Sequence, residues 1–139
     1  MITALDQKEA RELLTQGRIG HLGCVDDDGP YVVPVNYVFD GESVFVHSLM
    51  GRKIAALRAN PRACLQVEEV VDDYHWRSAI AFGTFGEVSD SAERDRAVAK
   101  LLARFPQLTP VESVPVHDGQ SSVILFRIRV EEVSGVAEK

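Results

Sequence analysis

The candidate binding chemistry is concentrated in one stretch, where an apolar strand pattern ends in His47-Ser48 and Gly51-Arg52-Lys53 opens a helical pattern. A strand end exposes side chains, a glycine lets a ligand approach the backbone, and a helix start offers free N–H groups to an anion. Two adjacent cations at the positive end of a helix dipole are unfavourable unless an anion is bound there. We therefore expect a site for a phosphorylated ligand. The alternative is a solvated helix start that Ser48 caps.

Two further segments contain candidate contacts for a flat ligand. Pro34 interrupts the strand pattern at Pro34-Val35-Asn36, and its missing N–H indicates either an edge strand or backbone groups left free to bind a heterocycle. Trp76, the only tryptophan, stands shortly before Ser78 and a buried-looking strand. It could form a flat wall for an aromatic ligand, an anchor in a subunit interface or an ordinary part of the core.

Other kinds of site have little support in the sequence. His47 has no metal-ligating partner at useful spacing, because His21, His75 and His117 are scattered, so no metal site is expected. The Gly-x-Ser-x-Gly pattern of a serine nucleophile is absent. Neither cysteine stands in a setting that would activate its thiol.

The composition is that of one globular domain spanning residues 1–139. The formal net charge of −6 argues against general nucleic-acid binding, which needs a basic face. The sequence has neither an apolar run of about 18 residues nor a signal peptide, so we expect a cytoplasmic protein that does not enter a membrane. Cys24 and Cys64 lie in apolar runs and are interpreted as small buried residues without a disulfide.

Hydrophobic periodicity predicts three helices and six strands. The first helix is capped by Asp6 and ended by Gly17, and the other two cover Gly51–Asn60 and Ser91–Phe105. The strands are expected at Ile19–Val25, Tyr31–Phe39, Ser43–Ser48, Ala63–Val71, Ser78–Val88 and Ser122–Val133.

The connections between these elements favour an antiparallel sheet. Asp-Gly pairs at 28–29 and 40–41 predict tight hairpins, and Pro106–Gln120 is expected to be a loop. Gly83 and Gly86 inside a strand indicate bulges or sharp bends, as barrels need. The predicted fold class is α+β, mainly β, with a closed or nearly closed antiparallel barrel.

Five segments of the chain, in this order, carry a family resemblance. They are Gly17-Arg18-Ile19-Gly20-His21-Leu22-Gly23, Tyr31-Val32-Val33-Pro34-Val35-Asn36-Tyr37, His47-Ser48-x-x-Gly51-Arg52-Lys53, Asn60-Pro61-Arg62-Ala63-Cys64 and Trp76-Arg77-Ser78-Ala79-Ile80. Over roughly residues 1 to 130 the chain resembles the pyridoxamine 5′-phosphate oxidase-like proteins with the FMN-binding split barrel, in the branch that includes nitroimidazole-resistance proteins.

The resemblance implies a six-stranded split barrel that forms a homodimer, with FMN bound at the interface. It also implies a role for each candidate residue. Val35 and Asn36 would meet the flavin ring largely through backbone groups, His47 and Ser48 would lie against the ring and the ribityl-phosphate side, Arg52 and Lys53 would hold the phosphate, and Trp76 and Ser78 would close the site, in part from the second subunit.

The function expected from this resemblance is an FMN-dependent oxidoreductase that reduces a small electron-poor substrate, such as a nitroaromatic compound. His47 is the candidate catalytic residue, since an imidazole near the ring can tune charge or relay a proton near neutral pH. One alternative is a non-catalytic module that binds flavin, haem or a deazaflavin. Another is pyridoxamine 5′-phosphate oxidase itself, but the end of the chain, Val133–Lys139, lacks the arginine-leucine-x-proline segment of those enzymes.

Overall fold

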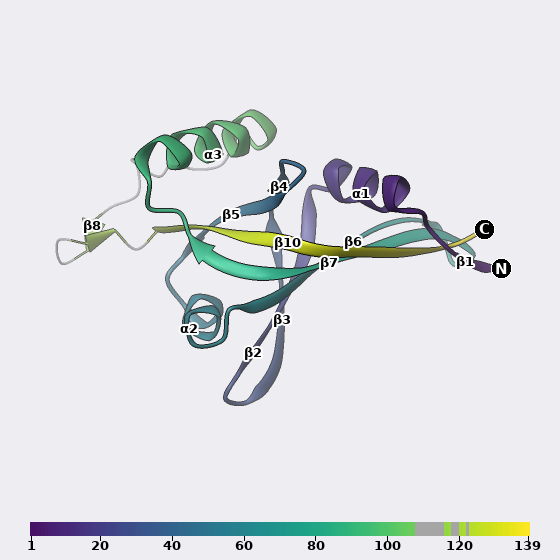
Figure 1. The fold of residues 1–139 in the computed structure, drawn as a ribbon, viewed down its shortest axis with the longest axis horizontal. Coiled ribbons are helices and arrows are strands. Elements are labelled where there is room, and N and C mark those ends of the chain that lie inside the picture. Colours follow the sequence, from purple (N-terminus) through teal and green to yellow (C-terminus); the bar gives the residue numbers. More distant parts are fainter. Residues whose placement is uncertain (108–115, 118–119, 122) are drawn as a thin grey trace.

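The computed structural model describes residues 1–107, 116–117, 120–121 and 123–139 (Figure 1). The elements along the chain are β1 (Ile2–Ala4), α1 (Gln7–Gln16), β2 (Ile19–Asp26), β3 (Gly29–Asn36), β4 (Val38–Phe39), β5 (Ser43–Leu49), α2 (Arg52–Ala59), β6 (Arg62–Asp72), β7 (His75–Glu87), α3 (Ser91–Arg104), β8 (Val116–His117), β9 (Gln120–Ser121) and β10 (Val123–Glu138). The three predicted helices and six predicted strands are all present.

The main sheet closes on itself as an antiparallel barrel. Its hydrogen-bonded order is β3-β2-β6-β7-β10-β5-β4, and only Tyr37 separates β3 from β4. The segment that contains β3 and β4 therefore pairs with β2 at one end and with β5 at the other. This arrangement confirms the predicted α+β fold with a six-stranded antiparallel barrel and flanking helices.

The barrel interior forms the main core. Alternate residues of each strand point inward, including Leu22, Val46, Leu65, Ala81 and Phe126, all nearly inaccessible to solvent. Figure 1 shows α1 and α3 on one side of the long strands and α2 with the β2–β3 hairpin on the other. A second apolar cluster lies where α3 covers the outer side of β5 and β10.

Two glycines allow close approaches between segments distant in sequence. Gly17, which follows α1, has an extended backbone. It therefore does not end the helix through the left-handed conformation for which glycine is usually required. A Cβ atom at this position would collide with the hydroxyl of buried Tyr37. At Gly83, a Cβ atom would collide with the carbonyl group of Arg129. The bulge predicted near this glycine lies in the partner strand, between Val130 and Glu132 of β10.

The ends of the chain differ from the prediction. The last strand continues to Glu138, where β10 pairs with both β7 and β1. The short strand β1 was not predicted, because its three exposed residues carry no burial pattern. The predicted loop over 106–120 contains the short strand β8, and most of the remaining loop lies outside the described residues. No helix among the described residues has the length and apolar character needed to cross a membrane.

Candidate functional site

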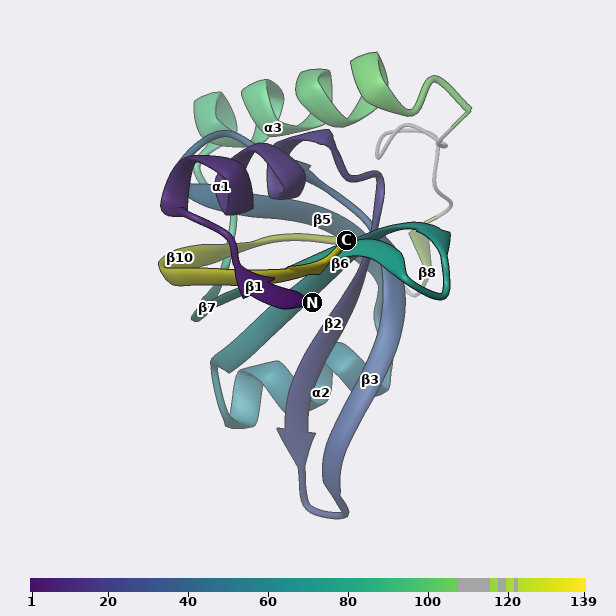
Figure 2. The same cartoon turned by 90° about the vertical axis from the view of Figure 1, so that its right-hand side faces the viewer.

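The start of α2 lies beside the β2–β3 hairpin, whose strands run past the helix in Figure 2. Gly51 occupies the N-cap position, no side chain accepts a hydrogen bond from the first-turn N–H groups, and this turn contains no acidic residue. Ser48 does not cap the helix, because its hydroxyl donates to the carbonyl oxygen of Leu49 at 2.8 Å. The helix start is therefore open to an anion, with two cations next to it.

Arg52 is held by the hairpin. Its Nε donates to Asp26 Oδ2 at 2.6 Å, a second nitrogen lies 3.9 Å from Asp28 Oδ2, and its guanidinium carbon lies 4.4 Å from the ring centroid of Tyr31. The hydrogen bond from Arg52 lowers the pKa of the Asp26 carboxyl. Arg52 is thus fixed in place, and its charge is already partly balanced.

Lys53 has a different environment from its neighbour. Its side chain is half-buried, and within the part of the chain that the structure describes it has no hydrogen bond or ion pair to a carboxylate. Burial lowers the pKa of Lys53, and the nearby Cys24 thiol opposes this shift. A half-buried ammonium group without a counterion is the strongest local sign that this site is built for an anion.

The strand segment at Pro34 belongs to β3, the strand at one end of the hydrogen-bonded order. Among the described strands β3 pairs only with β2, so its other edge is free. This agrees with the edge strand that the proline at position 34 indicated. Val35 points into the core, whereas Pro34 and Asn36 lie on the outer face. The Asn36 amide donates to the carbonyl oxygen of Arg18 at 3.4 Å. Backbone groups on the free edge of β3 are thus available to a ligand.

His47 lies near the end of β5, opposite Leu125 of β10. Burial lowers the pKa of this half-buried imidazole, so the neutral form predominates at neutral pH. Its ring has no hydrogen-bond partner in the described ranges. Such a group can accept or donate a proton once a ligand covers it.

The structure also reveals polar residues that the sequence analysis did not assign to a site. His21 Nδ1 lies 3.0 Å from Gln66 Oε1, and Gln66 Nε2 donates to Ser78 Oγ at 2.9 Å. This row crosses β2, β6 and β7 on the outer face of the sheet. Strand alternation could have placed His21 and Gln66 on outer faces, but only the strand register shows that they meet.

An apolar cavity lies next to this row. It has a volume of about 310 Å³, and its lining includes Gly23, Val32, Cys64 and Phe82. The strand register places Val32 of β3, Gly23 of β2, Cys64 of β6 and Phe82 of β7 side by side. Because Gly23 has no side chain, the outer face is hollow at this point.

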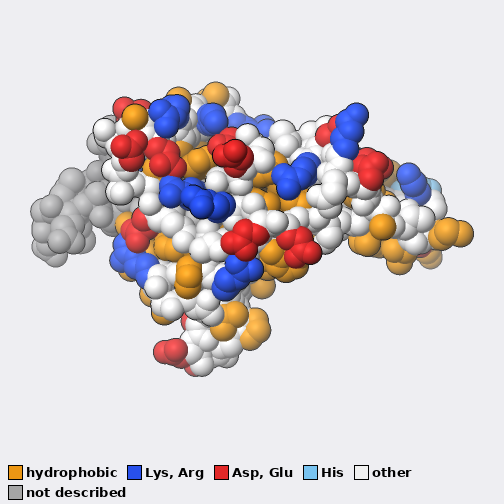
Figure 3. Space-filling view, viewed as in Figure 1, with side chains coloured by type: hydrophobic (Ala, Val, Ile, Leu, Met, Phe, Trp, Pro, Cys, Tyr) orange, Lys and Arg blue, Asp and Glu red, His pale blue; other side chains and the backbone are white. Residues whose placement is uncertain are grey.

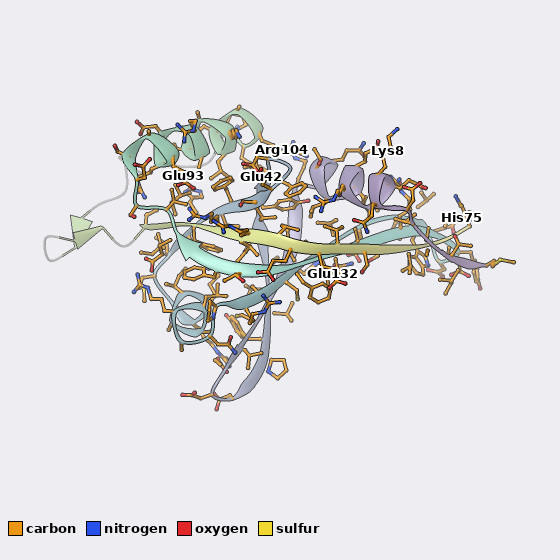
Figure 4. All side chains as sticks on the ribbon, in the orientation of Figure 1. Lys8, Glu42, His75, Glu93, Arg104 and Glu132 are labelled. Atoms are coloured by element: carbon orange, nitrogen blue, oxygen red, sulfur yellow. The ribbon has the colours of Figure 1, made fainter. Side chains whose placement is uncertain are left out.

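Trp76 is not brought to the start of α2 within one chain. Its Nε1 donates to Glu138 Oε2 at 3.2 Å, near the end of the molecule that holds both termini. His75, the neighbour of Trp76, is labelled at this end in Figure 4, far from α2. Ser78, the other residue expected to close the site, accepts a hydrogen bond from Gln66, which is not one of the predicted site residues.

A cavity of about 540 Å³ lies elsewhere, between α1, α3, the β4–β5 hairpin and β10. Acidic and basic side chains are interspersed over the face shown in Figure 3, which carries β10. Arg127 and Glu93, which line this cavity, neutralise each other across 2.6 Å. This cleft contains none of the predicted site residues. No cluster of three or more potential metal ligands occurs among the described residues.

Comparisons with known proteins agree with this architecture. An FAD-binding protein of Mesorhizobium loti has 31% sequence identity and a TM-score of 0.82, with 100% of this chain and 99% of that chain covered. A candidate 5-nitroimidazole antibiotic resistance protein of Bacteroides thetaiotaomicron has 20% identity and a TM-score of 0.75, over 99% of this chain and 89% of the other, which supports the fold alone.

The sequence comparisons cover nearly the whole chain. The uncharacterised protein RA0666 of Rhizobium meliloti (strain 1021) is 28% identical over 143 aligned residues, which cover 98% of this chain and 95% of that protein. The profile of the family described as pyridoxamine 5′-phosphate oxidase matches residues 6–137. The predicted resemblance is confirmed, and the chain belongs to the pyridoxamine 5′-phosphate oxidase family.

Proposed function

We propose that the protein is an FMN-dependent oxidoreductase that reduces a small electron-poor substrate, such as a nitroaromatic compound. The observation that carries this proposal is the half-buried Lys53 without a counterion, beside Arg52 at an uncapped helix start. A phosphate group would supply the missing charge and accept hydrogen bonds from the first-turn N–H groups. The relative named as an FAD-binding protein supports a flavin as the owner of that phosphate.

The residues have separate roles in this proposal. Lys53 and Arg52 bind the phosphate, and Gly51 leaves the backbone accessible. Free backbone groups of Asn36, on the unpaired edge of β3, orient the flavin ring beside Val35. When bound, flavin supplies the two-electron chemistry, while the protein excludes water and sets the charge near the ring.

Two residues would adjust the environment of the ring. His47, neutral and without a protein hydrogen bond, is placed to exchange a proton with the ligand. The Ser48 hydroxyl lies at the end of β5 and would turn from the Leu49 carbonyl to the ribityl-phosphate side.

A homodimer with the cofactor at its interface is part of the proposal. Ile19, Val32 and Val70 are exposed apolar residues (58%, 63% and 63%) on the outer face of β2, β3 and β6, which a second copy would cover. A second copy would also supply Trp76, which lies far from α2 in its own chain. The cysteines Cys24 and Cys64 are both free; Cys24 is buried as predicted, whereas Cys64 is only partly buried.

The first experiment is an absorbance spectrum of the purified protein, followed by mass identification of the released ligand. We expect the released ligand to be FMN. If it is FAD, haem or a deazaflavin instead, the cofactor assignment changes to that molecule. The double variant Arg52→Ala/Lys53→Ala should lose FMN affinity by at least tenfold. The matched control Lys8→Ala/Arg96→Ala removes two exposed cations elsewhere and should bind normally. Equal affinity in the two double variants would refute the phosphate site.

The second experiment separates an enzyme from a binding module. NADH or NADPH is added anaerobically to the FMN-loaded protein, and flavin bleaching is followed before a nitroaromatic compound is introduced. Bleaching and then reoxidation are expected for the proposed enzyme. If neither nicotinamide bleaches the flavin, the protein is a carrier or sensor, or uses another electron donor.

A further inference from the structure

The cleft of about 540 Å³ between the helices contains charged groups that the proposed flavin site does not use. α1 contributes Arg11 to its wall, α3 contributes Glu93, and the β4–β5 hairpin contributes residues 40–43. The floor is the outer face of β5 and β10, where Phe45 lies opposite Arg127 in the strand register. Four parts of the fold therefore enclose one polar space.

Ser43 brings an unsatisfied hydroxyl group to this cleft. Among the residues that the structure describes it is the only buried polar residue, with 8% of its surface exposed, and it lines the cleft. Its backbone N–H donates to Asp40 Oδ1 at 2.8 Å, and its carbonyl oxygen accepts from the Asp40 N–H at 3.1 Å. Its hydroxyl has no hydrogen-bond partner in the described part of the chain. A buried hydroxyl without a partner is unfavourable, so this group is available to a molecule in the cleft.

Arg129 lies directly opposite Ser43 in the pairing of β10 with β5. Side chains at directly opposite positions share one face of the sheet, with Cβ atoms about 5 Å apart. The guanidinium of Arg129 makes no hydrogen bond or ion pair within the described ranges, and it lowers the pKa of the Glu131 carboxyl only through its charge. Ser43 and Arg129 therefore offer a hydroxyl and a guanidinium fork to the same ligand.

Most acidic groups in the cleft already have partners. Glu93 Oε1 accepts from Arg127 Nη1 at 2.6 Å. Asp40 Oδ1 accepts two N–H groups of its own hairpin, and its Oδ2 lies 3.9 Å from Lys100 Nζ. Glu42 and Glu93 are labelled in Figure 4 on the side of β10 where the helices lie. Of the acids that line the cleft, only Glu42 has a side chain without a partner among the described residues.

The unpaired groups of the cleft leave an excess of positive charge. Arg11 is half-buried and donates only to the carbonyl oxygen of Gly41, at 3.4 Å, so no carboxylate balances it in the described chain. Arg11 and Arg129 are thus two unpaired cations against the single unpaired anion Glu42. A trapped water molecule would satisfy the Ser43 hydroxyl but would not balance this charge. The cleft therefore favours an anion.

We propose that this cleft is a second binding site, for a small organic molecule that carries a phosphate or carboxylate group. The oxyanion accepts hydrogen bonds from the Ser43 hydroxyl and the Arg129 guanidinium, and Arg11 adds positive charge from α1. Phe45 and Val130, which also line the cleft, provide apolar contacts for the carbon skeleton. A volume of about 540 Å³ is in the range of small-molecule sites. The inference does not rest on the proposed function, because the two sites share no residue.

The test is an NMR titration of the ¹⁵N-labelled double variant Arg52→Ala/Lys53→Ala, in which phosphate bound at the start of α2 cannot contribute. Inorganic phosphate and citrate are added separately at constant ionic strength. We expect saturable shifts of the Gly41 and Ser43 amide signals and of the Arg129 Nε–H signal. The probe that binds more tightly identifies the oxyanion, phosphate or carboxylate. Shifts that grow linearly with both probes and never saturate would overturn the site.

Single substitutions added to that variant test the assigned contacts. Arg129→Gln should weaken binding of the preferred probe at least tenfold, and Ser43→Ala about fivefold. Glu42→Gln should tighten binding, because it removes a negative charge. Arg96→Gln, which removes an exposed cation of α3 outside the cleft, is the matched control and should bind normally. Arg129 and Glu42 are exposed, so their variants decide the question even if Ser43→Ala fails to fold. Equal affinity in Arg129→Gln and Arg96→Gln would refute the site.

The outcomes separate this site from the proposed function. If the anions bind through Arg129 but the unaltered protein does not bind FMN, the proposed cofactor is wrong and the cleft site stands. If FMN binds through Lys53 but neither anion shifts the cleft signals, the cleft site is wrong and the proposed function stands.

Discussion

Arg104 at the end of α3 and Arg18 just after α1 each donate hydrogen bonds to the end of the other's helix. Arg104, the last residue of α3, donates to the carbonyl oxygens of Thr15 at 3.0 Å and Gly17 at 2.9 Å, at the end of α1. Arg18 returns a hydrogen bond of 2.8 Å to the carbonyl oxygen of Arg104. The last turn of α1 contains no basic residue of its own, so a cation from α3 complements its dipole. Figure 4 shows Arg104 on the side of α3 that faces the remainder of the molecule.

Arg104→Ala should lower the free energy of unfolding by about 2–3 kcal/mol, because several charged hydrogen bonds to helix carbonyls are lost. Arg18→Ala should cost about 1 kcal/mol, since it removes one such bond on the exposed side. Urea unfolding measures both changes. Arg96→Ala, an exposed position on α3, is the control and should stay within about 0.5 kcal/mol of the wild type. Equal stability of Arg104→Ala and Arg96→Ala would contradict the capping role.

Gly17 and Tyr37 should be coupled in stability. The buried Tyr37 hydroxyl donates to the carbonyl oxygen of Leu14 and occupies the space that a Cβ at Gly17 would need. Gly17→Ala and Tyr37→Phe should each destabilise the fold by about 1–3 kcal/mol. The double variant should lose less than the sum, because Phe leaves room for the methyl group. Additive losses in a double-mutant cycle would show that the two positions are independent.

Tyr37 also gives a prediction for alkaline pH. Burial raises the pKa of its phenol above the ordinary value. The folded state therefore holds the proton more tightly, and stability is lost as the pH rises above about 10, the pKa of an exposed tyrosine. Tyr37→Phe should remove this part of the alkaline decline in a series of unfolding curves. An unchanged decline in that variant would assign it to other groups.

Much of the fold was predictable because its determinants are local. The Asp-Gly pairs specify tight turns, and Gly29 and Gly41 adopt positive φ angles of 111° and 99°. Asp6 caps α1 by accepting from the Glu9 N–H at 2.8 Å, as its position before the helical pattern predicted. The period-two pattern of a strand is likewise local, and it agrees with the burial of Leu22 and Leu65 in the core.

The remaining features depend on contacts between distant segments. Nothing near Arg52 in the sequence reveals that Asp26 holds it, because the pairing depends on where α2 meets the hairpin. The row from His21 to Gln66 requires the register of β2 against β6. The sequence around Gly17 indicated a helix terminator. The structure shows instead that glycine is needed there because the hydroxyl of Tyr37, distant in sequence, occupies the space of a Cβ atom.

Asp26 should oppose phosphate binding. Its carboxylate, 2.6 Å from Arg52, balances the guanidinium charge and repels an incoming anion. Asp26→Asn should tighten FMN binding about fivefold, the effect of removing roughly 1 kcal/mol of charge repulsion in solvent. Asp28→Asn is the control, because Asp28 lies 3.9 Å from Arg52 and is exposed, and its effect should be smaller. Weaker binding in Asp26→Asn would instead mean that Asp26 is needed to position the arginine.

Lys53 should make FMN affinity depend on pH in the alkaline range. A lysine loses its charge as the pH rises through its pKa, and burial lowers the pKa of Lys53 below the ordinary value. FMN affinity should therefore begin to fall at a lower pH than it would if the lysine were exposed. Bound phosphate stabilises the ammonium form and so raises the pKa of Lys53 in the complex. Lys53→Arg is the matched variant, because a guanidinium stays protonated throughout this range. Equilibrium titrations between pH 7 and 10 should show a decline in the wild type and a flat profile in Lys53→Arg. Parallel declines in both proteins would exclude Lys53 as the titrating phosphate ligand.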